Sequence, residues 1–266
     1  MTEPELVVVS DARAARAEGA RRIASILALA IADQGRADWA VTGGATAAGI
    51  YRTLADESIR DEVEWAAVHV WWGDDRYVPR DDPLSNVKPF DDILLGLGHA
   101  EEGIAGGPAG LPIPLDQLHP FRTSEAIGRA RGAAWCAAAL ADELSVAGPA
   151  FENGLPAFDL LTLGMGGDGH VMSVFPGSVA LDSPELALPI PAPTHIEPHV
   201  ERLTQNPGII TAARRIVVVV VGAEKAAAIA DVLGPVRDPR RWPAQLARRA
   251  GATWILDEAA AAHLWR

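Results

Sequence analysis

The chain has one cysteine, only two lysines and no hydrophobic run long enough to cross a membrane. Cys136 cannot form an internal disulfide, and its apolar neighbours AAWCAAALA favour a buried helix residue over a catalytic thiol. The strongly apolar run IVVVVV at 216–221 is far shorter than the roughly 20 residues of a membrane span. No basic region precedes the first apolar run, so no signal peptide is expected. These absences predict a cytoplasmic protein that does not bind a membrane.

Positive charge is also scarce. The chain carries 35 acidic and 23 basic residues, which gives a net charge of −12. A negative field repels nucleic acid and anionic membranes, so no nucleic-acid partner is expected. If the ligand is an anion, the protein must gather positive groups locally to hold it. The positions of the basic residues, including the two lysines Lys88 and Lys225, are therefore informative.

Short apolar runs, nearly continuous rather than alternating, recur along the chain between helical patterns. Such runs are typical of strands buried on both faces of a parallel sheet, and the alternation predicts a doubly wound α/β fold. Ser10 and Asp11 begin one expected helix that Gly35 ends, and Thr123 begins a second that runs to Gly148. The expected strands are 6–10, 39–42, 66–72, 158–163, 216–221 and 253–256.

No internal repeat or linker divides the chain, so a single domain over residues 1–266 is expected. Two stretches interrupt the regular pattern. Residues 96–120 are rich in glycine and proline, and residues 176–207 contain seven prolines. Loops of this length are either functional covers or solvated excursions. The first fits a surface excursion at least as well as a cover, whereas a lid is expected for the second.

Four expected strands end in glycine followed at once by polar residues, in the segments GGAT, GDDR, GMGGDGH and GAEK. In an open parallel sheet the carboxyl ends of the strands form one edge, and ligands bind outside that edge. Any one glycine could merely permit a tight turn. Four such segments predict a common site instead. Its expected members are Thr46, Asp74, Asp75, Arg76, Asp168, His170 and Lys225.

Two of these segments favour an anion. Gly43 and Gly44 let backbone N–H groups approach an anion where a helix begins and its dipole is positive. The hydroxyl of Thr46 can either cap that helix or donate to a phosphate oxygen. Lys225 is expected in the first turn of another helix, where a cation is disfavoured unless an anion is bound. The alternative for Lys225 is a solvated surface lysine.

The segment GMGGDGH contains the pattern G-x-G-x-x-G, which also occurs in dinucleotide-binding folds. That interpretation needs a long helix afterwards, but Pro176 follows within seven residues, so we reject a nicotinamide cofactor. The loop instead delivers Asp168 and His170 together at a strand end. Imidazole titrates near neutral pH, so His170 is the best general base, with Asp168 to orient it or to hold substrate. A hydrogen-bonded structural histidine is the alternative.

Other chemistries fit poorly. The chain has no G-x-S-x-G nucleophile segment. His195 and His199 have the spacing of metal ligands on a helix, but Pro198 between them argues against that helix. No cluster of carboxylates or cysteines accompanies them, so a solvated loop is the better interpretation. Neither a metal nor a cofactor is expected.

Taken in order, GGAT, VWWGDDRYVPRDDPLSN, LLTLGMGGDGHVMSVFPGS, RLT and VVGAEK resemble the glucosamine-6-phosphate isomerase/6-phosphogluconolactonase family over nearly the whole chain. The resemblance implies a Rossmann-like three-layer α/β/α domain with a mostly parallel sheet, an active site at the carboxyl edge of the strands, and no nucleotide or metal. It also implies hydrolysis of a sugar phosphate lactone, 6-phospho-D-glucono-1,5-lactone, to 6-phospho-D-gluconate in the oxidative pentose phosphate pathway.

Carried over residue by residue, the resemblance implies that His170 is the base that activates water. It places Asp74 and Asp168 along the sugar site and makes Arg202, in RLT, a further candidate for substrate contact. The phosphate-binding residues that it implies are Gly43, Gly44, Thr46, Arg76 and Lys225.

The sequence departs from the family pattern at two places. Asp75 stands where the family has the glutamate of D-E-R, so it is one methylene shorter. In the phosphate loop, Thr42, Ala45 and Ala47 replace the two serines and the proline of S-G-G-S-T-P. One hydroxyl donor is therefore missing at the expected phosphate site, although Thr46 and the backbone N–H groups remain.

Two other functions compete with the predicted lactone hydrolysis. The sister activity, glucosamine-6-phosphate deaminase, typically has H-I-A-F-N-E-P and D-E-Y, but His170 is followed here by VMSVFP, which lacks the Asn-Glu pair. A non-catalytic sugar-phosphate sensor would share the crevice but usually carries a DNA-binding helix pair. The net charge of −12 and the lack of a basic N-terminal segment oppose DNA contact. An enzyme is the better prediction.

Overall fold

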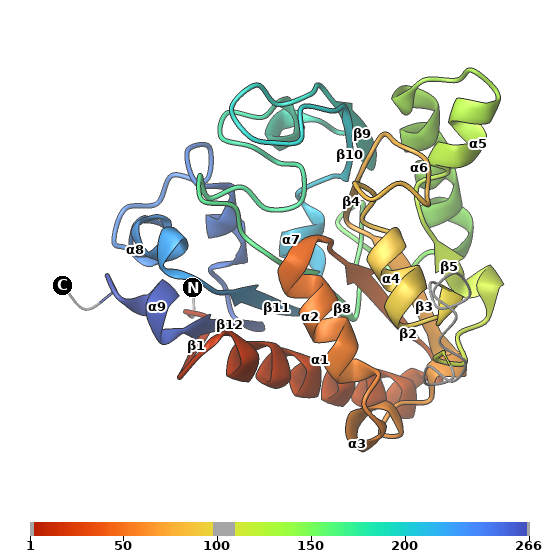
Figure 1. Cartoon of the computed structure of the whole chain (residues 1–266). Helices are drawn as coiled ribbons and strands as arrows, with labels where there is room; N and C mark the ends of the chain where they lie inside the picture. The colour runs from red at the N-terminus through yellow and green to blue at the C-terminus, as the bar shows by residue number, and fades with distance from the viewer. Residues whose placement is uncertain (1–2, 98–109, 265–266) are drawn as a thin grey trace.

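The computed structural model describes residues 3–97 and 110–264. Its central element is a seven-stranded parallel sheet in the order β1-β12-β11-β8-β2-β3-β5 (Figure 1). The strands are β1 (Glu5–Val9), β2 (Ala37–Val41), β3 (Val68–Trp72), β5 (Leu118–His119), β8 (Leu160–Leu163), β11 (Arg215–Val220) and β12 (Ala252–Asp257). Every residue of β2 and β8 is buried, as expected for strands covered on both faces. All six strands predicted from the apolar runs are confirmed.

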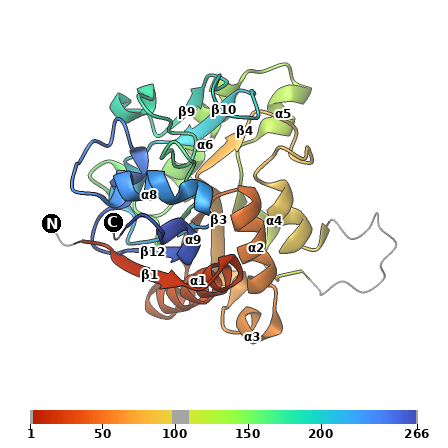
Figure 2. The ribbon, with the colours of Figure 1, turned by 60° about the vertical axis from the view of Figure 1, so that its left-hand side comes forward.

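Helices cover both faces of this sheet. They are α1 (Ala12–Gln34), α2 (Gly44–Leu54), α3 (Glu57–Arg60), α4 (Lys88–Ile93), α5 (Thr123–Gly128), α6 (Ala133–Ala147), α7 (Ile209–Ala212), α8 (Ala226–Leu233) and α9 (Glu258–Ala261). Figure 2 shows α1, α2 and α4 side by side, on connections that step towards β5. Helices α6 and α8 lie on connections that step back towards β1. Right-handed crossovers place the two sets on opposite faces, which gives the predicted three-layer α/β/α fold.

Short 3₁₀ helices complete the connections: η1 (Trp65–Ala67), η3 (Leu115–Gln117), η4 (Val179–Asp182), η5 (Ala223–Lys225) and η6 (Pro243–Ala247). A small hairpin pairs β6 (Phe151–Glu152) with β7 (Leu155–Pro156). No helix of residues 3–97 or 110–264 is long and apolar enough to cross a membrane.

Of the two helices predicted from their caps, one is confirmed and the other is wrong. Helix α1 is confirmed, because the Asp11 side chain accepts a hydrogen bond from the N–H of Ala14 and Gly35 ends the helix at φ +76°. The single helix from Thr123 to Gly148 is wrong, because the chain forms α5 and α6 instead. Between them Ala130 adopts φ +52°, and the N–H of Arg131 donates to the carbonyl oxygen of Ala126. This left-handed turn ends α5.

The proline-rich segment 176–207 is more regular than expected. It contributes β9 (Ala187–Ile190) and β10 (Arg202–Gln205) to a three-stranded antiparallel sheet with β4 (Asp74–Arg76), in the order β4-β10-β9. The N–H of Gln205 donates to the carbonyl oxygen of Gly73, the residue between β3 and β4. The small sheet therefore stands on the carboxyl edge of the main sheet (Figure 1).

The segment 96–120, which was expected to be a loop, also contains a strand. Residues 98–109 lie outside the described part of the chain, but residues 118 and 119 form β5, which pairs with β3 at the edge of the main sheet. Two residues give no recognisable alternation in the sequence. This strand depends on pairing with β3.

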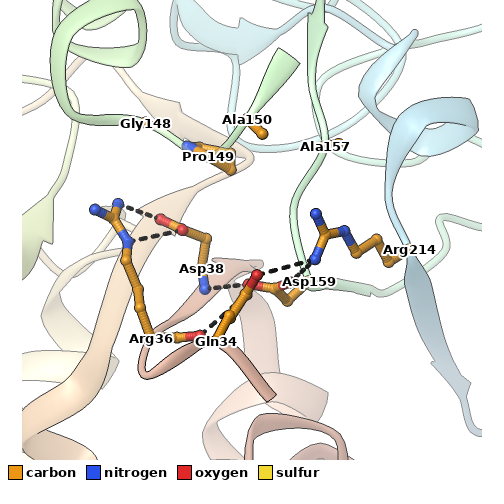
Figure 3. Close-up of a pocket in the computed structure, with 9 residues that line it drawn as sticks. All are labelled: Gln34, Arg36, Asp38, Gly148, Pro149, Ala150, Ala157, Asp159 and Arg214. Carbon is orange, nitrogen blue, oxygen red and sulfur yellow. Dashed lines mark hydrogen bonds and ion pairs between the residues drawn. The ribbon is translucent and has the colours of Figure 1, made fainter. Parts of the chain in front are cut away.

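The amino edge of the main sheet is fixed by buried carboxylates (Figure 3). Asp159 accepts hydrogen bonds from the backbone of Asp38, from Gln34 and from Arg214 at 2.8 to 3.0 Å. Asp38 in turn binds the guanidinium of Arg36 at 2.6 and 2.8 Å. Because both carboxylates are satisfied within this network, it aligns the starts of β2, β8 and β11 and offers little for a ligand. The chemistry lies at the opposite edge.

Candidate active site

A cavity of about 490 Å³ opens at the carboxyl edge of the parallel sheet. This volume is within the usual range for a small-molecule site. The segments that follow β2, β3, β8 and β11 all reach it, together with β10 and the loop before it. Of the site residues predicted from the sequence, the cavity is lined by Gly43, Gly44, Thr46, Asp74, Arg76, His170, Arg202 and Lys225. Asp168 lies behind His170, against the imidazole.

His170 and Asp168 form a close pair. Nδ1 of His170 lies 2.6 Å from Oδ1 of Asp168, and the backbone N–H of His170 donates to the same oxygen at 3.1 Å. Burial alone would raise the pKa of Asp168, but the hydrogen bonds and charge of His170 hold it well below its usual range. Asp168 is therefore ionised at neutral pH. It fixes the orientation of the imidazole, whose Nε2 is left available for a ligand.

The glycines of this loop are required by close contacts. A Cβ on Gly166 would lie 2.0 Å from Nδ1 of His170 and 2.7 Å from Oδ1 of Asp168, so the pair folds back directly over this residue. Gly169 adopts φ +78°, and a Cβ there would meet the ring of Trp242 at 2.5 Å. The glycine pattern that suggested a dinucleotide motif serves to place a histidine and its carboxylate.

His195 is an exposed loop residue, as expected, but it also contacts this pair. Its Nε2 lies 3.1 Å from Oδ2 of Asp168, and its ring contacts Phe175 edge to face. Phe175 also contacts the ring of His170 at 4.8 Å between centroids. The proline-rich segment thus reaches the second oxygen of Asp168. His199 instead bonds to the carbonyl oxygen of Pro193.

Asp74 lies at the wall of the cavity and is 5% exposed. Its carboxylate accepts hydrogen bonds from Nδ2 of Asn86 at 3.2 Å and from Oγ of Ser173 at 2.8 Å. Asn86 also lines the cavity, and its Oδ1 is buried without a partner against Gly43. Asn86 and Ser173 could not be located from the sequence, because nothing local shows that distant segments meet at Asp74.

Asp75 does not line the cavity and is fully buried, so its expected place in the common site is wrong. Its Oδ1 accepts the backbone N–H groups of Arg76 and Asn86 at 2.8 and 2.7 Å, which ties β4 to the loop that follows it. Burial raises the pKa of Asp75 to about 7, against the opposing effect of those hydrogen bonds. A longer glutamate is not needed for this structural contact.

Asp75 gives a pH prediction for stability. Since its pKa is about 7 when folded but about 3.9 in an unfolded chain, the native state retains a proton that the unfolded state releases. Its contribution to stability is therefore full below pH 4 and is lost as the pH rises to about 7. Asp75→Asn cannot ionise, so between pH 5 and pH 8 it should gain on the order of 2 kcal/mol relative to the unsubstituted protein. Urea unfolding of both proteins at the two pH values measures this difference. A difference that does not change with pH would contradict it.

Arg76 and Arg202 lie directly opposite each other on β4 and β10. Each donates to one carbonyl oxygen, that of Leu84 for Arg76 and that of Pro198 for Arg202. The Nε of each is buried without a partner, and neither forms an ion pair with a described residue. Burial lowers the pKa of Arg202, and the neighbouring charge of Arg76 lowers it further. Two adjacent guanidinium groups that form no ion pair with a described carboxylate are typical of an anion site.

The loop after β2 supplies further donors. Gly43 is the N-cap of α2 and has no side chain to cap the helix, and the Thr46 hydroxyl forms no hydrogen bond with a described residue. Lys225 lies in η5 and forms the N-cap of α8, slightly earlier than the helical turn predicted for it. A Cβ on Gly167 would be 3.9 Å from its Nζ, and Lys225 forms no ion pair within the described part of the chain. Among residues 3–97 and 110–264, no group of three or more His, Cys, Asp or Glu residues is arranged to hold a metal ion.

The fold and this cavity define a class of protein: Rossmann-like α/β proteins that bind a small anionic ligand at the carboxyl edge of a parallel sheet. Comparison with known proteins narrows the class. The model of the glucosamine-6-phosphate isomerases/6-phosphogluconolactonase family matches residues 10–255, and the chain belongs to this family.

Individual relatives agree with this assignment. The chain is 32% identical to a 6-phosphogluconolactonase of Streptomyces coelicolor, over 99% of this chain and 95% of the relative. It is 33% identical to that of Mycobacterium tuberculosis, over 93% of both chains. The solved 6-phosphogluconolactonase of Trypanosoma brucei superposes with a TM-score of 0.84 at 27% identity, over 99% of this chain and 100% of that one.

A monomeric glucosamine-6-phosphate deaminase also shares the fold, with a TM-score of 0.75 at 16% identity over 97% of this chain and 99% of that one. At this identity the similarity extends to the fold alone. The choice between the two activities of the family therefore depends on the residues of the site.

Proposed function

We propose that the protein hydrolyses 6-phospho-D-glucono-1,5-lactone to 6-phospho-D-gluconate. The observation that carries the proposal is the His170–Asp168 pair at 2.6 Å, in a cavity that also holds cations without carboxylate partners. A base that faces a site for a phosphorylated ligand suits hydrolysis of a carboxylic ester in a phosphorylated sugar. The names of the relatives support the lactone as that ester.

In this mechanism His170 acts as the general base. Its Nδ1–H donates to Asp168, so Nε2 takes a proton from water while the water oxygen forms a bond to C1 of the lactone. The carbonyl electrons move onto the oxygen and give a tetrahedral oxyanion. When the C1–ring oxygen bond breaks, His170 returns its proton to the departing ring oxygen. The single product carries both a carboxylic acid group, which ionises, and a free hydroxyl group.

The remaining residues hold the substrate in place. The phosphate, far from C1, is bound by Arg76, Lys225, Thr46 and the N–H groups of the Gly43–Gly44 loop. Such remote contacts fix the position of the ring relative to the base. Asp74 lines the sugar site, and Arg202 makes a further contact with the substrate. Asp168, which the resemblance placed along the sugar site, instead lies behind His170 and orients it.

The chain as a whole forms one domain of a cytoplasmic enzyme in this account. The strand nearest the N-terminus, β1, pairs with the last strand, β12, in the same sheet, which supports a single domain over residues 1–266. One buried cysteine and a net charge of −12 support a cytoplasmic enzyme that acts on a small molecule and does not bind nucleic acid.

A substrate comparison tests this function against the sister activity. The protein should hydrolyse 6-phosphogluconolactone and leave glucosamine 6-phosphate unchanged, because the segment after His170 lacks the Asn-Glu pair expected for the deaminase. Acid release from the lactone and ammonia release from the amine measure the two reactions. Ammonia release at a rate above that of acid release would favour the deaminase.

A further inference from the structure

The cavity is also reached by a residue that does not come from a strand end. Arg16 lies in the second turn of α1, yet its side chain lines the same cavity as Lys225 and the Gly43–Gly44 loop. It gets there by crossing α2 at Gly49. A Cβ on Gly49 would lie 2.4 Å from Cδ and 2.7 Å from Nε of Arg16, so the glycine provides the passage. The start of α2 carries the expected phosphate loop, and Arg16 crosses that helix one turn further along.

Among the described residues, Arg16 has no polar partner that would explain this position. Its Nε is buried and forms no hydrogen bond, and it forms no ion pair within residues 3–97 or 110–264. The arginines of the following turn behave differently: Arg21 pairs with Glu18, and Arg22 pairs with Glu18 and Glu5. A buried donor without a partner is costly, and a buried cationic donor more so. An anion bound in the cavity would provide the missing partner for the Arg16 guanidinium.

The charge of the cavity is consistent with an anion there. Four cations line it, Arg16, Arg76, Arg202 and Lys225, and none of them forms an ion pair with a described residue. Three carboxylates also line it: Asp74 accepts hydrogen bonds from Asn86 and Ser173, Glu197 lies 3.1 Å from His199, and Glu224 is exposed. The four cations therefore outnumber the three carboxylates before a ligand binds, and a phosphate dianion would give them a partner.

We propose that Arg16 is a ligand of the substrate phosphate, an inference that rests on the proposed lactonase function. Arg16 donates to a phosphate oxygen from the side of α1, together with Lys225 and the N–H groups of the loop. It supplies a donor at a site where Ala45 removes one hydroxyl group that the family loop carries. Arg16 is thus a binding residue that this chain adds to the phosphate site.

Kinetics with two lactones test the proposal. Arg16→Ala should raise KM for 6-phosphogluconolactone by about 10- to 100-fold with little change in kcat, as expected for loss of one charge-assisted contact. It should not change the hydrolysis of gluconolactone, which has no phosphate. Arg13→Ala, an exposed arginine one turn earlier on the same helix, is the matched control and should not change either rate. An Arg16→Ala variant with unchanged KM, or with equal losses on both lactones, would overturn the proposal.

Two further measurements separate this proposal from its premise. Calorimetric binding of 6-phosphogluconate does not require turnover, and Arg16→Ala should weaken it by the same factor even if the protein were not a lactonase. Equal affinity in both proteins would overturn the role of Arg16 whatever the activity. Thermal unfolding gives the second measurement, since removal of an unpartnered buried donor should leave Tm unchanged or raised. A lowered Tm together with unchanged 6-phosphogluconate affinity would instead identify Arg16 as a structural contact of α2.

Discussion

His170→Ala should lower kcat for 6-phosphogluconolactone by at least about 100-fold, the usual contribution of a general base. Binding of 6-phosphogluconate should be largely intact, because the phosphate contacts lie elsewhere in the cavity. The close approach of Asp168 to Nδ1 gives the base a fixed orientation, which the alanine variant loses entirely. Steady-state rates, corrected for spontaneous hydrolysis, together with calorimetric binding of the product, measure both effects.

The matched control is His199→Ala, which removes a histidine that bonds to the carbonyl oxygen of Pro193 rather than to Asp168. Its turnover should stay close to that of the unsubstituted protein. Near-normal turnover in His170→Ala itself would make His170 a structural residue. Asp168 would then be the next candidate for the base.

Lys225→Ala should raise KM for the phosphorylated lactone through the loss of about 1.5–3 kcal/mol of binding free energy. The reason is that Lys225 lies beside the glycine loop of His170 without an ion-pair partner in the described residues. Arg76→Ala should act in the same direction. Both variants should handle gluconolactone as poorly as the unsubstituted protein does, because the missing phosphate already removes the contact.

The other lysine provides the control for this prediction. Lys88 lies on α4 and pairs with Asp92, so Lys88→Ala should leave KM unchanged. If Lys225→Ala weakened the hydrolysis of both lactones equally, Lys225 would support the fold or the chemistry. The phosphate would then have to bind elsewhere in the cavity.

The main sheet could be predicted because its strands carry their own signal. Runs such as IVVVVV are buried on both faces, and their apolar character does not depend on knowing the neighbouring strand. Strands β5, β9 and β10 carry no such signal. They are two to four residues long, one contains Pro189, and each depends on a partner that is distant in the sequence. The break between α5 and α6 was missed because the caps at Thr123 and Gly148 indicated the outer ends of the helical region but not the turn at Ala130.

The residues of the site also fall into two groups, those that could be predicted from the sequence and those that could not. Residues that directly follow a strand could be located from the sequence, because the parallel topology brings strand ends to one edge. Residues that come from elsewhere could not: Asn86 reaches the cavity from a loop and Arg16 from α1, and His195 of the proline-rich segment reaches Asp168. Arg16 can reach the cavity because Gly49 of α2 has no side chain. The sequence does not reveal this role, because it depends on the packing of α1 against α2.

Hydrolysis of freshly prepared 6-phosphogluconolactone in the presence of a chelator tests the central claim most directly. The chemistry assigned to His170 and Asp168 uses water and an imidazole, so the protein should accelerate the reaction well above the spontaneous rate with no added metal. The chelator should not diminish this acceleration. A rate equal to the spontaneous background, measured with protein shown to be folded, would contradict the assignment of this cavity as a lactonase site.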